Sequence, residues 1–415
     1  MTKALYISYF GVREPLVQTQ VLPYLRELVK GGVEMTILTF ESVHLSPDEC
    51  ELIKTELRAQ NIRWRSLRYH SRPRLLATFF DVFTGTILVG LEICRGNAQI
   101  IHARSHVSAL IAELASSLIL WKKTKTIFDI RGFLPEEYVD AGILNRDGLV
   151  YKLVKRVERW LLRRADGLVV LTERAAAIIK HELVLMHEDD SVRHLQVIPC
   201  CVDLTYFAPV SLAEKEASRK ELHLESRLVI AYVGSLDGWY MTDEMFELFS
   251  SLRKTKENTF ALILTRGDRA RAVKALEASG FESSDYLVMG VAPKDIRKYL
   301  SAADAAISFV KPTYSKQASS PTKNAEYLAC GLPIVVNAGV GDTENQITAD
   351  RVGVVISEIS ESSFQEAAGN LEQLLNEGEA LRNRCVNSAK KHFSLTEVGG
   401  PRYRELYRLL LPNGE

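Results

Sequence analysis

The 415-residue chain lacks most of the short patterns that assign a sequence to a class. Its six cysteines are scattered, with no CxxC pair and no Cys/His spacing, so neither a zinc site nor a disulfide framework is indicated. No strand is followed by GxGxxG and a downstream acidic residue, which disfavours a nicotinamide dehydrogenase. Lys plus Arg and Asp plus Glu both total 52, so the molecule as a whole is not a polyanion binder.

Uninterrupted apolar runs are also short. The N-terminal stretch MTKALYISYF has no basic-then-apolar signal pattern. The longest apolar run, residues 75–94, is interrupted by Asp81 and Glu92 and is shorter than a comfortable membrane span. We expect it to form a buried or interfacial helix. Together with the scattered cysteines, these features predict a cytoplasmic protein.

Short apolar strands alternate with longer amphipathic helical patterns, such as 18–30 and 48–58. A first series of strands reads ALYISYF, MTILTF, QIIHAR, KTIFDIRG and GLVVLT; a second reads LVIAYVGS, FALILTRG, YLVMG, AAISFV, LPIVVN and VGVVI. Buried strands separated by helices indicate parallel sheets covered on both faces. The sequence therefore predicts an α/β protein with two Rossmann-like, doubly wound parallel-sheet domains that face each other across a cleft.

The boundary between the two series is marked by a change in composition. The stretch IPCCVDLTYFAPVSLAEKEASRK has two prolines, no sustained apolar period and a charged end. We place the linker within residues 203–226, an N-terminal domain at 1–205 and a second domain at 206–392.

The stretch SSPTKNAEYLACGLPIVVN, residues 319–337, predicts a short helix with a ligand site at its start. Ser320 suits the N-cap and Pro321 the first helical position, and Gly331 with Pro333 ends the helix. The free N–H groups and partial positive charge of a helix N-terminus form a natural phosphate site.

Two charged residues of this helix are candidate ligand contacts. Lys323 adds a cation where the helix dipole disfavours one, which an anionic ligand would explain. Glu326 lies one turn on, where a carboxylate can accept hydrogen bonds from ribose hydroxyls. The competing interpretation, a solvated Lys323–Glu326 pair with no ligand, is equally consistent with the pattern.

The stretch SPTKNAEYLACGLPIVV resembles the nucleotide-sugar-binding segment of family 4 glycosyltransferases, which are retaining enzymes of the two-domain GT-B fold. VLPYLRELVKGGVEMTILT, ADGLVVLTERA, VIPCCVDLTYF and LVIAYVGSLDG resemble other family segments in the expected order. The resemblance implies that the second domain binds a nucleotide-diphosphate sugar, UDP- or GDP-linked, as co-substrate and without another cofactor. It also implies that residues 393–415 form a helix that crosses back to the N-terminal domain, which binds the acceptor.

The resemblance also carries specific roles and a reaction. It places Glu326 on the donor ribose, and it places Ser320, Thr322 and Lys323 at the diphosphate. The implied reaction is metal-independent hexosyl transfer to a glycan or lipid-linked acceptor, in the synthesis of a bacterial surface polysaccharide or glycoconjugate. The chain has no Asp-x-Asp, the metal-chelating pair of sugar transferases with a different fold.

Three positions depart from the family pattern. Ala318 stands where the family has the first of two glutamates, and Ser235, after Gly234, stands where many members have an arginine that binds the diphosphate. A second family cation, a few residues later, is also missing from DGWYM. By sequence position, Lys323 and Arg266 are the nearest substitutes. Trp239 and Tyr240 could stack on a base or sugar, or simply pack on the following helix.

Polar residues after two strands of the N-terminal domain are candidate catalytic or acceptor contacts. Arg131 or Asp129 aligns with a histidine of many family members, and Arg131 could stabilise the leaving diphosphate or pair with Glu136 or Glu137. In IIHARSH, His102 is a candidate catalytic residue and Arg104 an acceptor contact, as is Glu137, although a lone histidine there is more often structural.

Arginines cluster in RAQNIRWRSLRYHSRPRLL, immediately before the apolar run. Arginine and interfacial aromatic residues beside an apolar helix predict contact with an anionic membrane surface, here through Arg63, Arg65 and Arg68. The alternative is a solvated strand followed by a buried helix; nothing else in the chain supports nucleic-acid binding. We therefore expect a peripheral protein on the inner face of the plasma membrane.

Two other functions remain open at this point. One is a sugar-nucleotide epimerase or phosphorylase on the same fold. The other is a catalytically degenerate subunit that only binds a partner, which Ala318 and Ser235 make worth testing.

Overall fold

The computed structural model describes residues 2–119, 121–186 and 194–411 of the chain. The chain divides into two compact units: unit 1 contains Met1–Pro199 and Leu395–Glu415, and unit 2 contains Cys200–Ser394. The chain thus enters unit 2 at Cys200, slightly before the predicted boundary, and returns to unit 1 at Leu395.

Unit 1 is built on a seven-stranded sheet in the order β3-β2-β1-β4-β5-β6-β7, with every neighbouring pair parallel. Its central strands are buried on both faces, as expected when helices cover both sides. The strands are β1 Lys3–Ser8, β2 Glu34–Glu41, β3 Ile62–Arg68, β4 Ile100–Arg104, β5 Lys125–Asp129, β6 Gly167–Val170 and β7 His194–Val197.

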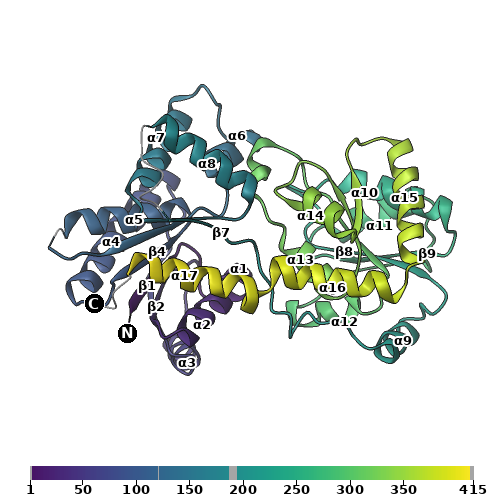
Figure 1. Cartoon of the computed structure of the whole chain (residues 1–415), viewed down its shortest axis with the longest axis horizontal. Helices are drawn as coiled ribbons and strands as arrows, with labels where there is room; N and C mark the ends of the chain where they lie inside the picture. The colour runs from purple at the N-terminus through teal and green to yellow at the C-terminus, as the bar shows by residue number, and fades with distance from the viewer. Residues whose placement is uncertain (1, 120, 187–193, 412–415) are drawn as a thin grey trace. The chain divides into compact units, whose positions relative to one another are not determined.

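Helices lie on both faces of this sheet (Figure 1). The predicted helix at 18–30 is broken at Val21 into α1 and α2, whereas α3 begins at Pro47 behind a capping box made by Ser46 and Glu49. The helices are α1 Pro15–Gln20, α2 Leu22–Lys30, α3 Pro47–Arg58, α4 Arg74–Cys94, α5 Ser105–Leu118, α6 Leu134–Asp140, α7 Leu149–Arg164, α8 Glu173–Leu185 and, from the C-terminal segment, α17 Gly400–Leu410.

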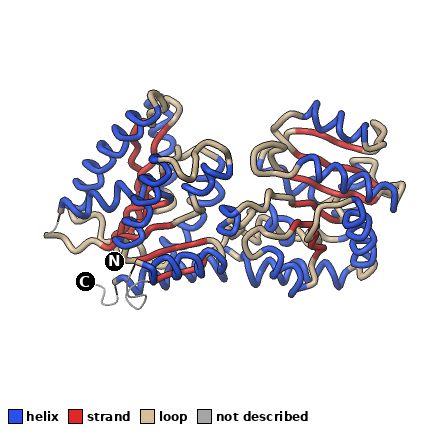
Figure 2. Tube along the Cα trace, turned by 90° about the horizontal axis from the view of Figure 1, so that it is seen from above, coloured by secondary structure: helices blue, strands red, loops and turns tan. Residues whose placement is uncertain are grey.

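Unit 2 has a six-stranded sheet in the order β10-β9-β8-β11-β12-β13, again parallel throughout. Figure 2 shows its strands (red) running between layers of helices (blue). The strands are β8 Leu228–Val233, β9 Thr259–Leu264, β10 Tyr286–Met289, β11 Ala305–Ser308, β12 Ile334–Asn337 and β13 Gly353–Ile356.

The helices of unit 2 follow its strands, and one of them lies in the predicted linker. Residues 203–226 are not simply an open linker, because α9 forms within them behind a capping box of Ser211 and Glu214. The helices are α9 Leu212–Glu221, α10 Thr242–Thr255, α11 Arg269–Ala278, α12 Ile296–Leu300, α13 Thr322–Ala329, α14 Thr343–Asp350, α15 Glu361–Leu375 and α16 Glu379–Phe393.

Both units have the strand order of a doubly wound dinucleotide-binding sheet, so the predicted α/β class with two such domains is confirmed. In each sheet the order reverses beside the first strand, between β1 and β4 in unit 1 and between β8 and β11 in unit 2. Ligands of such sheets bind beyond the carboxyl ends of the strands at this reversal.

Candidate functional site

The candidate site lies in unit 2, where β8 ends beside the start of α13. The N–H of Val233 donates a 2.7 Å hydrogen bond to the hydroxyl of Tyr327, which holds α13 against the end of β8. Gly234 follows with φ +141°, and a Cβ there would lie 2.8 Å from Nζ of Lys323. Only glycine combines this backbone conformation with room for the lysine head group.

Lys323 is a buried lysine whose ammonium makes no direct polar contact among the described residues. Its residue is 7% exposed, and among the described residues Nζ has no hydrogen-bond partner. The ammonium lies 4.3 Å from the ring centre of Tyr232 and 3.9 Å from that of Tyr240. Cation–π contacts of this kind recover part of the cost of desolvation but do not replace an anion.

The electrostatics of the site reflect this burial. Burial lowers the pKa of Lys323 to about 7, an effect that Glu326 partly opposes. Burial likewise raises the pKa of Glu326 to about 7, and Lys323 partly opposes that shift. Within the described residues Nζ of Lys323 has no hydrogen-bond partner and the residue is buried, so the pair predicted as the no-ligand alternative is not present in its solvated form.

A second buried lysine, Lys316, was not predicted from the sequence. It is 5% exposed, and its Nζ lies 3.7 Å from the ring centre of Trp239. The turn that carries Trp239 is fastened to the end of β11, because Tyr240 forms an antiparallel bridge with Val310. A lysine after strand AAISFV, at the carboxyl edge of the sheet, was the signal that could have found it.

The start of α13 differs in detail from the prediction. Pro321, not Ser320, is the N-cap residue, and Thr322 begins the helix. The hydroxyl of Ser320 instead accepts a 3.1 Å hydrogen bond from the N–H of Cys200. No side chain caps α13, and although the N–H of Asn324 donates to the carbonyl of Pro321 at 3.0 Å, the N–H groups of Thr322 and Lys323 before it stay available to a ligand.

The other donor-side candidates are arranged more loosely. Arg266 is exposed and donates a long 3.4 Å hydrogen bond to the carbonyl of Val291, so it is not part of the buried lysine cluster. Ser235 is also exposed, and its carbonyl accepts a hydrogen bond from the hydroxyl of Tyr232. Ala318 is 2% exposed.

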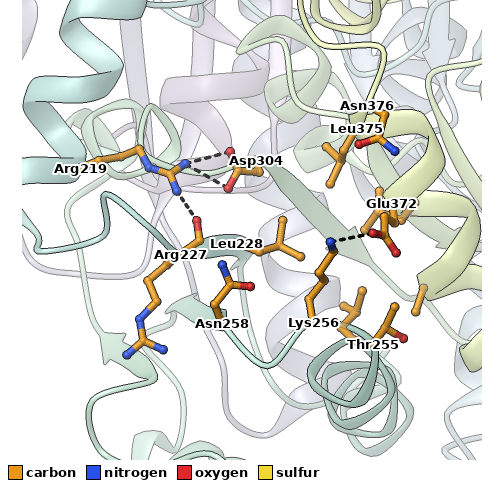
Figure 3. A pocket seen from close by; sticks show the side chains of 13 residues that line it. Arg219, Arg227, Leu228, Thr255, Lys256, Asn258, Asp304, Glu372, Leu375 and Asn376 are labelled. Carbon is orange, nitrogen blue, oxygen red and sulfur yellow. Dashed lines mark hydrogen bonds and ion pairs between the residues drawn. The ribbon is translucent and has the colours of Figure 1, made fainter.

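A well-formed cavity in unit 2, of about 310 Å³, lies away from these residues (Figure 3). It is lined by residues at the amino ends of the strands, among them Leu228, the first residue of β8. Arg219 and Asp304 are paired there at 2.8 Å, and Lys256 and Glu372 at 2.6 Å. Its charges are therefore satisfied within the protein, unlike that of Lys323.

In unit 1, Asp129 and His102 are buried in a cluster of polar groups. Asp129 is fully buried, accepts a 2.9 Å hydrogen bond from the hydroxyl of Tyr403, and lies 3.5 Å from the guanidinium of Arg131. Burial acts to raise the pKa of Asp129, but the charges of Arg131 and Arg104 and a hydrogen bond from His102 outweigh it and hold the pKa well below its usual range.

His102 has both ring nitrogens directed at protein groups. Its Nδ1 lies 3.0 Å from the hydroxyl of Tyr407 and its Nε2 3.5 Å from Asp129. Burial lowers its pKa, so the neutral ring is favoured. His102 is 1% exposed, and its catalytic role stays a prediction.

The remaining unit 1 candidates are only partly accessible. Arg104 is 5% exposed and donates a 3.4 Å hydrogen bond to the carbonyl of Gln20. Glu137 lies beside Gly132, and Glu136 pairs with Lys155 at 3.0 Å rather than with Arg131. Arg131, whose side chain is 10% exposed, is therefore the member of the Asp129 cluster that comes nearest to solvent.

No group of three or more His, Cys, Asp or Glu side chains that could hold a metal ion occurs among the described residues. The site in unit 2 thus consists of two buried lysines, three aromatic rings, one carboxylate and a helix start. This arrangement is suited to a phosphorylated ligand.

Known proteins resemble both halves of the chain. Residues 17–185 match the glycosyl transferase 4-like domain, and residues 214–392 match the glycosyl transferases group 1 family. A 2-deoxystreptamine glucosyltransferase from Streptomyces kanamyceticus is 28% identical over 49% of this chain, and the match spans only about half (51%) of that relative. A 2-deoxystreptamine N-acetyl-D-glucosaminyltransferase from Streptomyces fradiae is 25% identical over 80% of this chain and 77% of its own length.

Solved structures resemble the fold over its whole length. A glycosyltransferase from Rickettsia africae has a TM-score of 0.72 at 16% identity, with 100% of this chain and 99% of that chain covered. The Anabaena protein HepE, in complex with UDP and glucose, has a TM-score of 0.66 at 13% identity, with 98% of this chain and 100% of that chain covered. The two domain matches and the fold together identify the chain as a glycosyltransferase of the GT-B fold.

Proposed function

We propose that the protein is a retaining, metal-independent hexosyltransferase that uses a nucleotide-diphosphate sugar, UDP- or GDP-linked, and no other cofactor. The observation that carries the proposal is Lys323: a buried ammonium with no hydrogen-bond partner among the described residues, beside the uncapped start of a helix. A diphosphate supplies the missing anion. The UDP complex of HepE, on the same fold, supports this ligand class.

In this proposal the lysines stabilise the charge that develops on the leaving diphosphate. The glycosidic bond breaks and its electron pair goes to the β-phosphate oxygen. The oxygen of the acceptor hydroxyl forms the new bond on the same face of the sugar, and its proton passes to the leaving phosphate oxygen. Lys323 and Lys316 take the place of the family cations missing at Ser235 and in the turn after it. A contact that strengthens as the bond breaks lowers kcat when it is removed, not only affinity.

Two further roles are part of the proposal. Glu326 accepts hydrogen bonds from the donor ribose. Arg131, the member of the Asp129 cluster nearest to solvent, contacts the acceptor or the donor sugar. The acceptor is a glycan or a lipid-linked glycan, and the product belongs to a surface polysaccharide or glycoconjugate. The relatives named for 2-deoxystreptamine suggest a polyhydroxylated ring with free amines as a second acceptor class to assay.

The decisive experiment is calorimetric titration of UDP and of GDP into wild-type protein, Lys323→Met and Lys316→Met. A charge-assisted contact contributes about 1.5–3 kcal/mol, so each substitution should weaken binding of the preferred nucleotide about 10- to 150-fold. Lys254→Met, which removes an exposed lysine paired with Glu361, is the matched control. Wild-type affinity in both site variants would refute the proposed role of the lysines.

The reaction itself needs a separate test. Incubation with a sugar nucleotide and candidate acceptors should release the nucleotide diphosphate and give a glycoside with the donor's anomeric configuration, measurable by NMR. A changed sugar on an intact nucleotide would instead indicate an epimerase. Tight nucleotide binding without turnover on any acceptor would favour a non-catalytic binding subunit.

A further inference from the structure

We propose that α4 of unit 1 docks the protein on the surface of an anionic lipid bilayer, lying along it rather than crossing it. One face of this helix carries six apolar side chains that are between 47% and 69% exposed. Apart from the adjacent pair Phe79 and Phe80, they recur at intervals of three or four residues and so form a single stripe: Leu76, Phe79, Phe80, Phe83, Ile87 and Leu91. The stripe is about 22 Å long at the helical rise of 1.5 Å per residue.

Further exposed apolar side chains lie at the end of the helix that packs against α4. A Cβ on Gly85 would lie 2.8 Å from Ile111 of α5, and one on Gly90 would lie 3.2 Å from Ile119, the residue after α5. Just beside Ile119, Leu118 and Trp121 are 70% and 71% exposed. A tryptophan at the edge of an apolar face is typical of side chains that lie at a membrane–water interface.

The opposite face of α4 belongs to the core of unit 1. Asp81 is fully buried, accepts a 2.7 Å hydrogen bond from the hydroxyl of Tyr9, and lies 2.6 Å from Nδ1 of His70. Glu92, 3% exposed, accepts from Asn97 at 2.8 Å.

By length and composition alone, Leu76–Cys94 could cross a membrane, with a mean hydropathy of 1.6 and 44% of it buried. Crossing would strip these two carboxylates of their partners in hydrocarbon, at high cost. A helix that packs on the protein core with one face and exposes an apolar opposite face can instead lie in the plane of the membrane–water interface.

The charged side chains around the stripe indicate which kind of surface it contacts. Between residues 62 and 98, both acidic residues, Asp81 and Glu92, are buried, and the exposed charged side chains that the structure describes are all arginine: Arg63, Arg65, Arg68, Arg72 and Arg95. Lys122 and Lys123, next to Trp121, are also exposed.

A second copy docking through the same face would bring these like charges together, whereas anionic headgroups complement them. Of the three arginines first predicted to touch the membrane, two have acidic neighbours: Arg63 pairs with Glu34, and Arg65 lies 3.6 Å from Glu92. Arg68 has no such partner among the described residues.

The test is flotation of the full chain with phosphatidylcholine vesicles, with and without phosphatidylglycerol. The double variant Phe79→Gln/Phe83→Gln should lower partitioning at least about 150-fold, because burial of each apolar side chain contributes on the order of 1.5–3 kcal/mol. Arg68→Gln/Arg72→Gln should lower it about 30-fold on anionic vesicles only, since each basic residue near anionic lipid contributes about 1 kcal/mol.

The matched control is Leu149→Gln/Leu153→Gln, which removes two exposed apolar side chains from α7. Unchanged thermal unfolding and UDP titration show that each variant is folded. Equal partitioning of wild type and the phenylalanine variant, or an equal loss in the α7 control, overturns the proposal. Loss of a wild-type dimer in the phenylalanine variant, with no vesicle binding by either, also overturns it and assigns the stripe to self-association.

Discussion

Each unit contains a group of buried charged and aromatic side chains, and the two groups differ in whether the buried charge has a partner. In unit 1, Asp129 lies among Arg131, His102 and Tyr403, so its charge is matched within the protein. In unit 2, Lys323 has aromatic rings around it but no hydrogen-bond partner among the described residues.

A buried charge is costly unless it is paired. A buried charge that is matched internally therefore serves the fold, and one that is left unmatched marks the place of a ligand. The two clusters should respond in opposite ways when the charge is removed. The three predictions that follow test this contrast, from the largest expected effect to the smallest.

Removing the matched charge should destabilise the protein most. Asp129→Asn leaves Arg131 and Arg104 buried near each other without their anion. Breaking a buried ion pair in this way costs about 3–5 kcal/mol. Thermal or urea unfolding should show this loss, whereas Glu51→Gln, which removes an exposed partner of Lys54, should leave the unfolding midpoint unchanged. An unaltered midpoint in Asp129→Asn would mean that the cluster is not structural.

Removing the unmatched charge should stabilise the ligand-free protein. The pKa of Lys323 is about 7 in the fold and has an ordinary value of 10.5, so between these limits the unfolded chain binds more protons. Stability of the wild type should therefore rise with pH across this window, by up to about 1.4 kcal/mol per pH unit.

Lys323→Met should be the more stable protein at pH 7 and should lack this rise. Parallel urea titrations of the two proteins between pH 7 and 10 measure the difference, which cancels the titration of groups that do not interact with Lys323. The substitution also changes Glu326, whose pKa Lys323 lowers, so Lys323→Met/Glu326→Gln against Glu326→Gln is the matched comparison. A wild type that equals or exceeds the Met variant in stability at pH 7 would contradict the assignment of Lys323 as an unmatched charge.

The smallest effect should come from Glu326, which shares the site but is assigned to the ribose. Glu326→Gln keeps an acceptor and loses the charge, so it should weaken UDP and UMP about equally, by about 1 kcal/mol, or five-fold. Lys323→Met should instead weaken UDP much more than UMP. Calorimetric titration of both nucleotides against both variants separates the roles. A Glu326→Gln variant that loses affinity only for UDP would place the carboxylate near the diphosphate.

Local sequence patterns predicted much of this molecule. The alternation of apolar strands with amphipathic helices predicted two parallel, doubly wound sheets, because strands buried on both faces must be continuously apolar. Pro333, after Gly331, predicted where the helix after residue 320 stops, and α13 ends at Ala329. Lys323 and Glu326 stood out because a cation in a first helical turn is locally unfavourable.

The tertiary structure decided which of these charges are matched. The position of Lys316 after a strand marked it as a possible site residue, but its burial against Trp239 could not be predicted, because the two are far apart along the chain and are brought together where Tyr240 bridges to Val310. The sequence also left His102 open as a catalytic candidate, although Tyr407 of the C-terminal helix covers it. The spacing of apolar residues along the sequence predicts which side of a helix or strand is buried. Whether a charged side chain is buried, and whether it has a partner, depends on segments that only folding brings together.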